Sequence, residues 1–80
     1  MIPAMEVHLE RIDPDRNLWR WYRLSVRRTL FGDWTLTREW GRIGCCRGQV
    51  RCAFFDEEAQ ARAALSAVET RKLRRGYRSA

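Results

Sequence analysis

The sequence predicts an α+β fold, a small antiparallel sheet of about four strands with one C-terminal helix packed on one face. Three observations lead to this prediction. Before residue 56, four segments alternate apolar and polar residues, which is the period of a half-buried strand. Turn residues separate these segments. The last third of the chain instead repeats apolar residues at helical spacing.

The first two expected strands cover residues 5–12 and 19–28, and both alternate apolar and polar residues. The segment between them, Asp13-Pro14-Asp15-Arg16-Asn17, is rich in turn-forming residues. In the second strand one face carries apolar side chains by parity, namely Tyr22, Leu24 and Val26. This face is therefore expected to contribute to the core.

The third expected strand covers residues 34–43 and follows a turn signal, Phe31-Gly32-Asp33, so the two central strands are predicted to form a hairpin. By parity one face carries Trp34, Leu36, Arg38, Trp40 and Arg42. This face begins apolar and becomes mixed toward Trp40 and Arg42. We therefore expect the strand to leave the core and carry its last residues to an edge or rim.

The fourth expected strand covers residues 49–55 and follows an expected loop, in which Gly44 and Gly48 bracket Cys45-Cys46-Arg47. In this strand Val50, Cys52 and Phe54 alternate with the other residues. The alternation predicts that Cys52 points into the core.

One helix is expected to close the chain. Asp56 is the predicted N-cap, and Glu57 and Glu58 lie in the first turn, where the helix dipole favours negative charge. The predicted core stripe consists of Ala61, Ala64, Leu65 and Val68. Gly76 is the expected C′ residue, just beyond the end of the helix.

Length and composition predict a single globular domain over residues 1–80. The apolar fraction of 45% argues against disorder, and no apolar run is long enough to span a membrane. The three cysteines are odd in number and two of them are adjacent, so a disulfide framework is not expected. No signal peptide is recognisable at the N-terminus, and a reduced, cytoplasmic protein is the simplest interpretation.

The charge balance is the first functional indication. Sixteen basic against ten acidic residues give a net charge of +6, which favours polyanionic partners. All the basic residues except Lys72 are Arg, whose planar fork pairs with phosphate in two places and also stacks on rings. A high genomic GC content is an alternative explanation of the Arg bias, but it does not remove the positive charge.

Catalytic and metal-binding patterns are not recognisable in the sequence. His8 is the only histidine, and no nucleophile or acid accompanies it at a familiar spacing. Cys45, Cys46 and Cys52 form no CxxC pair, so structural zinc is not expected. There is no glycine-rich phosphate loop. We therefore expect a protein without catalytic residues, metal or cofactor that is not an enzyme.

The segment Trp40-Gly41-Arg42-Ile43-Gly44 resembles the motif of the WGR domain, a module named after its first three residues. The resemblance extends over nearly the whole chain. The further matching segments follow in the order expected for the family: Trp21-Tyr22-Arg23-Leu24, Gly32-Asp33-Trp34, Gly48-Gln49, the helix near Asp56 and Arg75-Gly76-Tyr77. WGR domains occur in DNA-damage-dependent poly(ADP-ribose) polymerases, where they bind near DNA breaks. They also occur in bacteria, in short stand-alone proteins and in relatives of a molybdate metabolism regulator. The chain resembles the bacterial stand-alone type, so ADP-ribosyltransferase activity is not implied.

The resemblance implies a nucleic-acid-binding function, with DNA favoured over RNA. It implies that Trp40 packs against the sugar or end of a strand and that Arg42 makes polar contacts at the same site or to a neighbouring domain. An indole face and a guanidinium on one strand face suit a base and its phosphate, and Gly41 leaves the backbone open to close approach. A basic C-terminal segment is the expected second wall, with Arg71, Lys72, Arg74, Arg75 and Arg78.

Each of these assignments has a structural alternative. Trp40 would equally serve as a core residue capping the helix end, and Arg42 as a solvated surface charge. The cations at the helix end also complement the helix dipole. At the level of function, the alternative is a protein-interaction adaptor that docks on an acidic partner without binding nucleic acid. The two expected edge strands leave self-association open.

Overall fold

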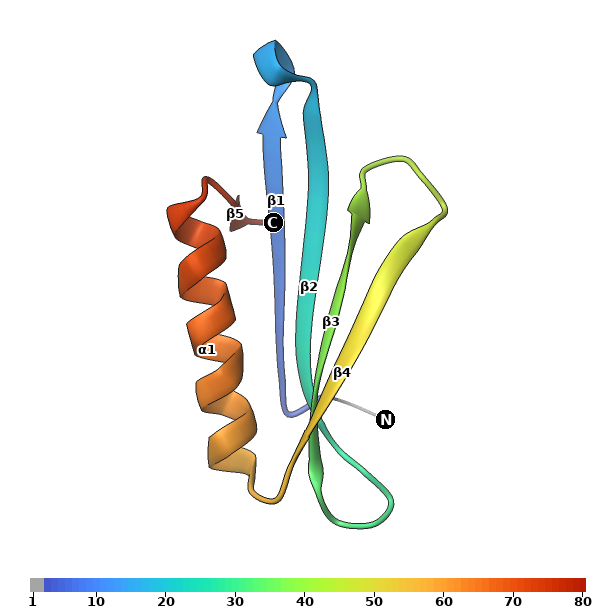
Figure 1. The fold of residues 1–80 in the computed structure, drawn as a ribbon, viewed down its shortest axis with the longest axis vertical. Helices are drawn as coiled ribbons and strands as arrows, with labels where there is room; N and C mark the ends of the chain where they lie inside the picture. Colours follow the sequence, from blue (N-terminus) through green and yellow to red (C-terminus); the bar gives the residue numbers. More distant parts are fainter. Residues whose placement is uncertain (1–2) are drawn as a thin grey trace.

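The computed structural model describes residues 3–80, so Met1 and Ile2 of the predicted domain lie outside the described residues. It contains one five-stranded antiparallel sheet and one long helix, which confirms the predicted α+β class (Figure 1). The elements in chain order are β1 (Met5–Asp13), the 3₁₀ helix η1 (Pro14–Arg16), β2 (Leu18–Arg28), β3 (Trp34–Arg42), β4 (Gly48–Phe55), α1 (Glu58–Arg74) and β5 (Arg78–Ser79).

The strands follow the order β4-β3-β2-β1-β5 across the sheet. The four long strands are the predicted ones and pair as successive antiparallel neighbours. β5 was not predicted, because two residues are too few to show alternation. It pairs with β1 through Leu9 and Glu10, and Ala80 N donates a hydrogen bond to His8 O at 3.0 Å. The end of the chain is thereby tied to the sheet edge opposite β4.

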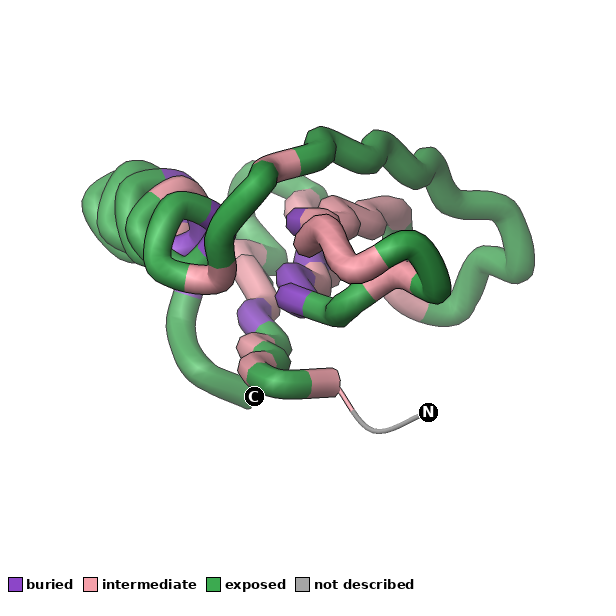
Figure 2. Tube along the Cα trace, turned by 90° about the horizontal axis from the view of Figure 1, so that it is seen from below, coloured by how far each residue is buried: buried purple, intermediate pink, exposed green. Residues whose placement is uncertain are grey.

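The core lies between α1 and one face of the sheet (Figure 2). The helix packs on β2 and β3, and its buried residues are three of the four in the predicted stripe, Ala61, Leu65 and Val68, with Ala64 half-buried beside them. The sheet and the closing segment contribute Leu9, Tyr22, Leu24, Val26, Leu36 and Tyr77. The predicted apolar face of β2 is thus confirmed as the centre of the core.

The N-terminus of α1 differs from the prediction. Glu57, not Asp56, is the N-cap, and its backbone N–H donates to the Gln60 side-chain oxygen at 3.3 Å. Glutamate is not a usual N-cap, but this reciprocal arrangement with the third helical residue satisfies a backbone donor that the first turn would otherwise leave free. The sequence prediction chose the residue type with the higher capping preference.

Gly76 is the C′ residue beyond the end of α1, as predicted, and has a φ of +102°. Gly76 N donates to Leu73 O at 3.1 Å, and Tyr77 N donates to Lys72 O at 3.1 Å. These two bonds form a Schellman motif, in which glycine adopts the left-handed conformation without a Cβ clash. The reversal turns the chain back so that Tyr77 is buried in the core.

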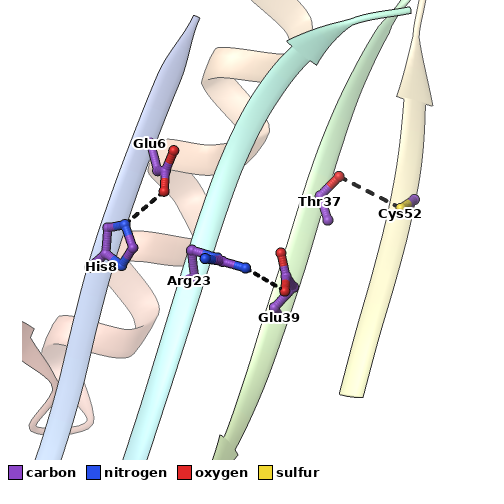
Figure 3. Close-up of polar contacts among 6 residues, drawn as sticks. All are labelled: Glu6, His8, Arg23, Thr37, Glu39 and Cys52. Carbon is purple, nitrogen blue, oxygen red and sulfur yellow. Dashed lines mark hydrogen bonds and ion pairs between the residues drawn. The ribbon is translucent and has the colours of Figure 1, made fainter. Parts of the chain in front are cut away.

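β4 is more exposed than the sequence predicts, and the expectation that Cys52 points into the core is wrong. All residues of β4 except Phe55 are exposed, because α1 lies over β2 and β3 and leaves this edge strand uncovered. Cys52 lies on the sheet face away from the helix, opposite Thr37 (Figure 3). Cys45, Cys46 and Cys52 are all free and exposed.

The sheet face away from α1 carries a row of polar pairs (Figure 3). Arg23 on β2 donates to Glu39 on β3 at 2.6 Å, in directly opposed positions of the register. On β1, His8 Nε2 lies 2.7 Å from Glu6 Oε1. This face is therefore solvated and polar at its centre. No helix within residues 3–80 is long and apolar enough to cross a membrane.

Candidate nucleic-acid interface

The β2–β3 register brings the motif residues next to two residues of β2. Tyr22 lies opposite Trp40, and Arg20 lies opposite Arg42. All four share the sheet face on which α1 packs, as the buried Tyr22 shows. The predicted common face of Trp40 and Arg42 is thus observed, and it is the helix side of the sheet.

Trp40 is half-buried, and one face of its ring packs against the core. Its indole stacks on Tyr22 with ring centroids 5.6 Å apart and planes 9° from parallel. Its cross-strand neighbour on the other side is Gln49 of the exposed strand β4, and Trp40 also lines the open groove described below. Trp40 therefore meets both expectations for this residue: it packs against the core, and it remains partly accessible for contact with a ligand.

The end of α1 supplies the second wall of the site. The Schellman reversal places the Tyr77 ring edge-on to Tyr22, with centroids 6.1 Å apart. Lys72 extends over these rings, its Nζ 4.5 Å from the Tyr22 centroid and 5.5 Å from that of Tyr77. An ammonium at this distance interacts favourably with the ring electrons. The rings thus hold the lysine beside the Trp40 stack.

Between these walls lies an open groove of about 560 Å³. Its lining combines four aromatic residues with five cations from three strands and the helix: Arg20, Trp21, Tyr22, Arg38, Trp40, Gly41, Arg42, Arg51, Lys72 and Tyr77. No acidic residue is among them. Within residues 3–80, none of the ion pairs involves a groove cation. The groove is therefore a concentrated positive site without internal counter-ions.

A smaller hollow of about 210 Å³ adjoins the groove and shares Arg38 and Lys72 with it. Its other lining residues are Val68, Arg71 and Arg75 of the helix end. The two hollows together form a cationic path from the end of β3 toward the helix.

The pKa of Lys72 is lowered by its position in the groove. Burial lowers the pKa of its ammonium below the usual 10.5, and the positive charges of Arg75, Arg38, Arg71 and Arg20 lower that pKa further. Both causes disfavour the charged form. An anion entering the groove would reverse the second cause, because it would neutralise the surrounding guanidinium charges.

Arg42 is exposed and its guanidinium donates to Asn17 Oδ1 at 3.3 Å. Asn17 follows η1 and adopts the left-handed conformation, with a φ of 55°. Asparagine tolerates this conformation better than most residues. The β1–β2 turn thus orients the motif arginine at the open end of the groove.

Gly41 has a packing role that the sequence did not reveal. A Cβ added there would lie 3.0 Å from Trp21 Nε1 and 3.1 Å from Arg47 O. Gly48, its partner on β4, is similarly covered by the Trp21 ring. The close approach that the glycine permits is therefore made by an indole of the same chain.

The structure brings together some of the predicted site residues and separates others. Trp40, Gly41, Arg42 and Lys72 line the groove, and Arg71 and Arg75 line the adjoining hollow. Arg74 and Arg78 line neither hollow. Arg78 lies on β5, at the sheet edge opposite β4. Its contact with nucleic acid, like that of Arg74, remains a prediction.

Sequence reasoning missed six residues of the groove: Arg20, Trp21, Tyr22, Arg38, Arg51 and Tyr77. The hairpin register gives a signal for three of them, because pairing around the Phe31-Gly32-Asp33 turn sets Arg20, Trp21 and Tyr22 opposite the motif residues. Tyr77 gives no such signal, since its position depends on the helix reversal.

Metal-ligating residues do not gather in the described part of the chain. No group of three or more His, Cys, Asp or Glu side chains that could hold a metal ion occurs in residues 3–80. The groove itself offers aromatic rings and cations, which suit an anionic ligand with flat or apolar parts.

Comparison with known proteins adds three findings. The family model described as WGR domain matches residues 5–80. A protein of Sinorhizobium fredii, named uncharacterized protein y4dW, is 42% identical over 72 residues, which cover 90% of this chain and 35% of that protein. The chain thus spans about a third of the length of this curated relative. No solved structure matches the chain significantly.

Proposed function

This chain belongs to the WGR domain family, and from that premise we propose that it is a nucleic-acid-binding module with DNA as its ligand. The observation that carries the proposal is the groove, in which a Tyr22–Trp40 stack lies among five cations without a carboxylate. Nucleic acids offer the matching combination of flat bases, sugars and regularly spaced phosphates.

The proposed mode of binding follows from the walls of the groove. The exposed part of Trp40 receives a sugar or base, and Arg42 and Arg20 each pair with a phosphate at the outer end. Lys72 and Arg38 meet the following phosphates at the helix side. Arg71 and Arg75 extend the path beyond it. We propose that the chain acts through this binding and not as an enzyme.

The test is fluorescence anisotropy with single-stranded DNA, blunt duplex, 5′-phosphorylated nicked duplex and RNA of matched length. We expect micromolar or tighter binding at low salt to at least one DNA, weakening steeply as salt rises. Absence of binding to every probe at low salt would refute the proposal. If the chain then captures one acidic protein in stoichiometric amount, the adaptor becomes the supported function, since the same cations suit a carboxylate-rich surface.

Two pairs of variants test whether the groove is the binding site. Arg20→Ala/Arg42→Ala removes two exposed groove cations and is expected to lower affinity roughly tenfold or more, with a salt slope reduced by about 2. Arg16→Ala/Arg27→Ala is the matched control, because it removes the same charge from exposed positions outside the groove. Equal losses in both would place binding elsewhere.

Trp40→Ala tests the stacking role directly. We expect a loss of about 1–3 kcal/mol in binding free energy for one stacked base. Because Trp40 also packs against the core, circular dichroism must show that the variant is folded at the temperature of the assay. Binding of the folded variant at wild-type strength would remove Trp40 from the site.

A further inference from the structure

The outer edge of β4 is a long strand edge that the described chain leaves unpaired. β4 lies at one edge of the sheet (Figure 1), and its residues 48–54 are all exposed. At the other side the sheet ends in β5, which has two residues. Unpaired edges present free peptide groups to other strands, and proteins usually protect them with charged side chains, proline or a covering element. β4 contains one charged residue, Arg51, and no proline.

The hydrogen-bonding pattern shows which peptide groups point outward. Ile43 N donates to Trp19 O at 2.7 Å, so the odd-numbered residues at the end of β3 bond to β2. Bonding direction alternates along an antiparallel strand, so the even-numbered residues of β3 bond to β4. Their opposites in β4 are odd-numbered, from Gln49 to Phe55. The free N–H and C=O groups therefore belong to Val50, Cys52 and Phe54.

The side chains of those same three residues form an exposed apolar row on the face away from α1. Val50 is 64% exposed and Phe54 is 67% exposed, and Cys52 lies between them. On the helix side of β4 the exposed residues are Gln49, Arg51 and Ala53. The strand thus offers an apolar row, a row with one charge, and a free backbone edge.

We propose that β4 pairs antiparallel with β4 of a second copy of this chain, with the two-fold axis at Cys52. In this register Val50 lies opposite Phe54 of the second copy, and Cys52 lies opposite its counterpart. Arg51 lies opposite the second copy's Ala53, so no like charges face each other. A register centred on Arg51 would oppose two guanidiniums, which is unfavourable. β4 is therefore complementary to itself in the register centred at Cys52.

The pairing would extend the groove. An axis perpendicular to the sheet keeps each face on its own side, so both helices and both grooves lie on the same face of a ten-stranded sheet. Arg51 lines the groove and lies on the joined edge, so the two cationic surfaces meet there. The dimer itself does not depend on nucleic-acid binding.

The expected dimer is weak. Two eight-residue strands joined by their edges form an interface smaller than most stable ones. Each copy carries a net charge of +6, so the copies repel each other at low salt. Salt screens this repulsion, and dimerisation is expected to strengthen as salt rises. Nucleic-acid binding has the opposite salt dependence, so the two proposals fail independently.

Sedimentation equilibrium of the full chain without nucleic acid, under reducing conditions and at high salt, tests the proposal. Over roughly two decades of concentration, the weight-average mass should rise from the monomer toward the dimer. Cys52→Pro should abolish the rise, because it removes an outward backbone donor and leaves the backbone hydrogen bonds to β3 intact. A mass that stays at the monomer value throughout would overturn the proposal.

Charge variants test the register. Ala53→Glu should tighten the dimer roughly twofold to thirtyfold, because two symmetry-related carboxylates would then oppose Arg51. Ala53→Arg should weaken it by a similar factor. Ala63→Glu and Ala63→Arg are the matched controls, since they change the net charge equally at an exposed position of α1. If the Ala53 variants behave like these controls, the copies associate through another surface and the β4 pairing is wrong.

Discussion

At the scale of single residues, the motif side chains have structural partners within the chain. Trp40 stacks on Tyr22, and Arg42 bonds to Asn17. Gly41 is covered by Trp21. Each contact fixes a side chain or backbone segment that borders the groove, which reduces the ordering that a ligand would have to impose.

The two glycines beneath Trp21 give a stability prediction. A Cβ at Gly48 would lie 2.9 Å from Trp40 O, whereas a Cβ at Gly41 would lie 3.0 Å from Trp21 Nε1 and 3.1 Å from Arg47 O. Trp40 O belongs to the paired strand β3, whereas Arg47 lies in the β3–β4 loop and can shift more readily. Gly48→Ala should therefore destabilise more than Gly41→Ala, by about 1–3 kcal/mol against about 1 kcal/mol. Urea unfolding of both variants checks this order. A reversed order would mean that the β4 backbone relaxes more easily than the packed ring.

Lys72 makes the stability of the fold depend on pH. Its pKa lies below 10.5 in the free protein because of burial and neighbouring arginines. Below this lowered pKa the ammonium is charged in both the folded and the unfolded states. Its charge then destabilises the folded state, in which it is partly buried and close to arginines. This destabilisation falls as pH rises through the lowered pKa and is gone above 10.5. Stability attributable to Lys72 therefore increases over this interval.

Phosphate binding should show the opposite trend, since it favours the charged lysine. We expect the DNA affinity of the wild type to fall as pH rises through the lowered pKa of Lys72, and we expect Lys72→Gln to lack this component. Anisotropy titrations from neutral pH to pH 10.5 compare the two proteins. Identical pH profiles would show that the lysine does not meet the phosphate.

At the scale of elements, α1 determines both the core and the site. Its inner stripe holds the helix over β2 and β3, and its Schellman end directs Lys72 and Tyr77 to the groove. The apolar stripe was predictable because helical periodicity is a local pattern. The partners of Lys72 and Tyr77 were not, because they depend on where the helix lies on the sheet.

Two leucines of α1 test this arrangement. Leu65 is fully buried and Leu73 is 46% exposed. Leu65→Ala should lower the free energy of unfolding by about 2–5 kcal/mol, through lost burial and the cavity it leaves. Leu73→Ala should lower it by about 1 kcal/mol or less. Thermal or urea unfolding measures both, and similar losses would mean that the helix packs by a different face.

At the scale of the whole molecule, charge is distributed unevenly between the two faces of the sheet. The helix side has five groove cations without a counter-ion. The other side pairs Arg23 with Glu39 and His8 with Glu6. The unpaired positive charge of the groove therefore lies beside the aromatic stack, and this distribution would favour the approach of a polyanion from the helix side.

The salt dependence of binding follows from that distribution. If each of the five groove cations meets one phosphate, the slope of log affinity against log salt should be roughly −3.5 for single-stranded and −4.5 for duplex DNA. Anisotropy at several salt concentrations measures this slope. A slope near −1 would show that most groove cations do not contact phosphate.

The sequence by itself determined the fold class, the four long strands, the helix stripe, the shared face of Trp40 and Arg42, and the resemblance to the family. These properties follow from periodicity, turn residues and a short motif, which are local in the chain. The position of the N-cap at Glu57 was missed because capping preference is only a statistical tendency.

Tertiary structure alone decided which residues surround the motif. It gathered Arg20, Arg38, Arg51, Lys72 and Tyr77 around Trp40, left Arg74 and Arg78 outside the groove, and exposed Cys52 on an uncovered edge. The physical reason is that alternation assigns a residue to one face of a strand, whereas burial depends on what covers that face. α1 covers the middle of this sheet, and the groove and the free β4 edge lie where the helix no longer covers the strands.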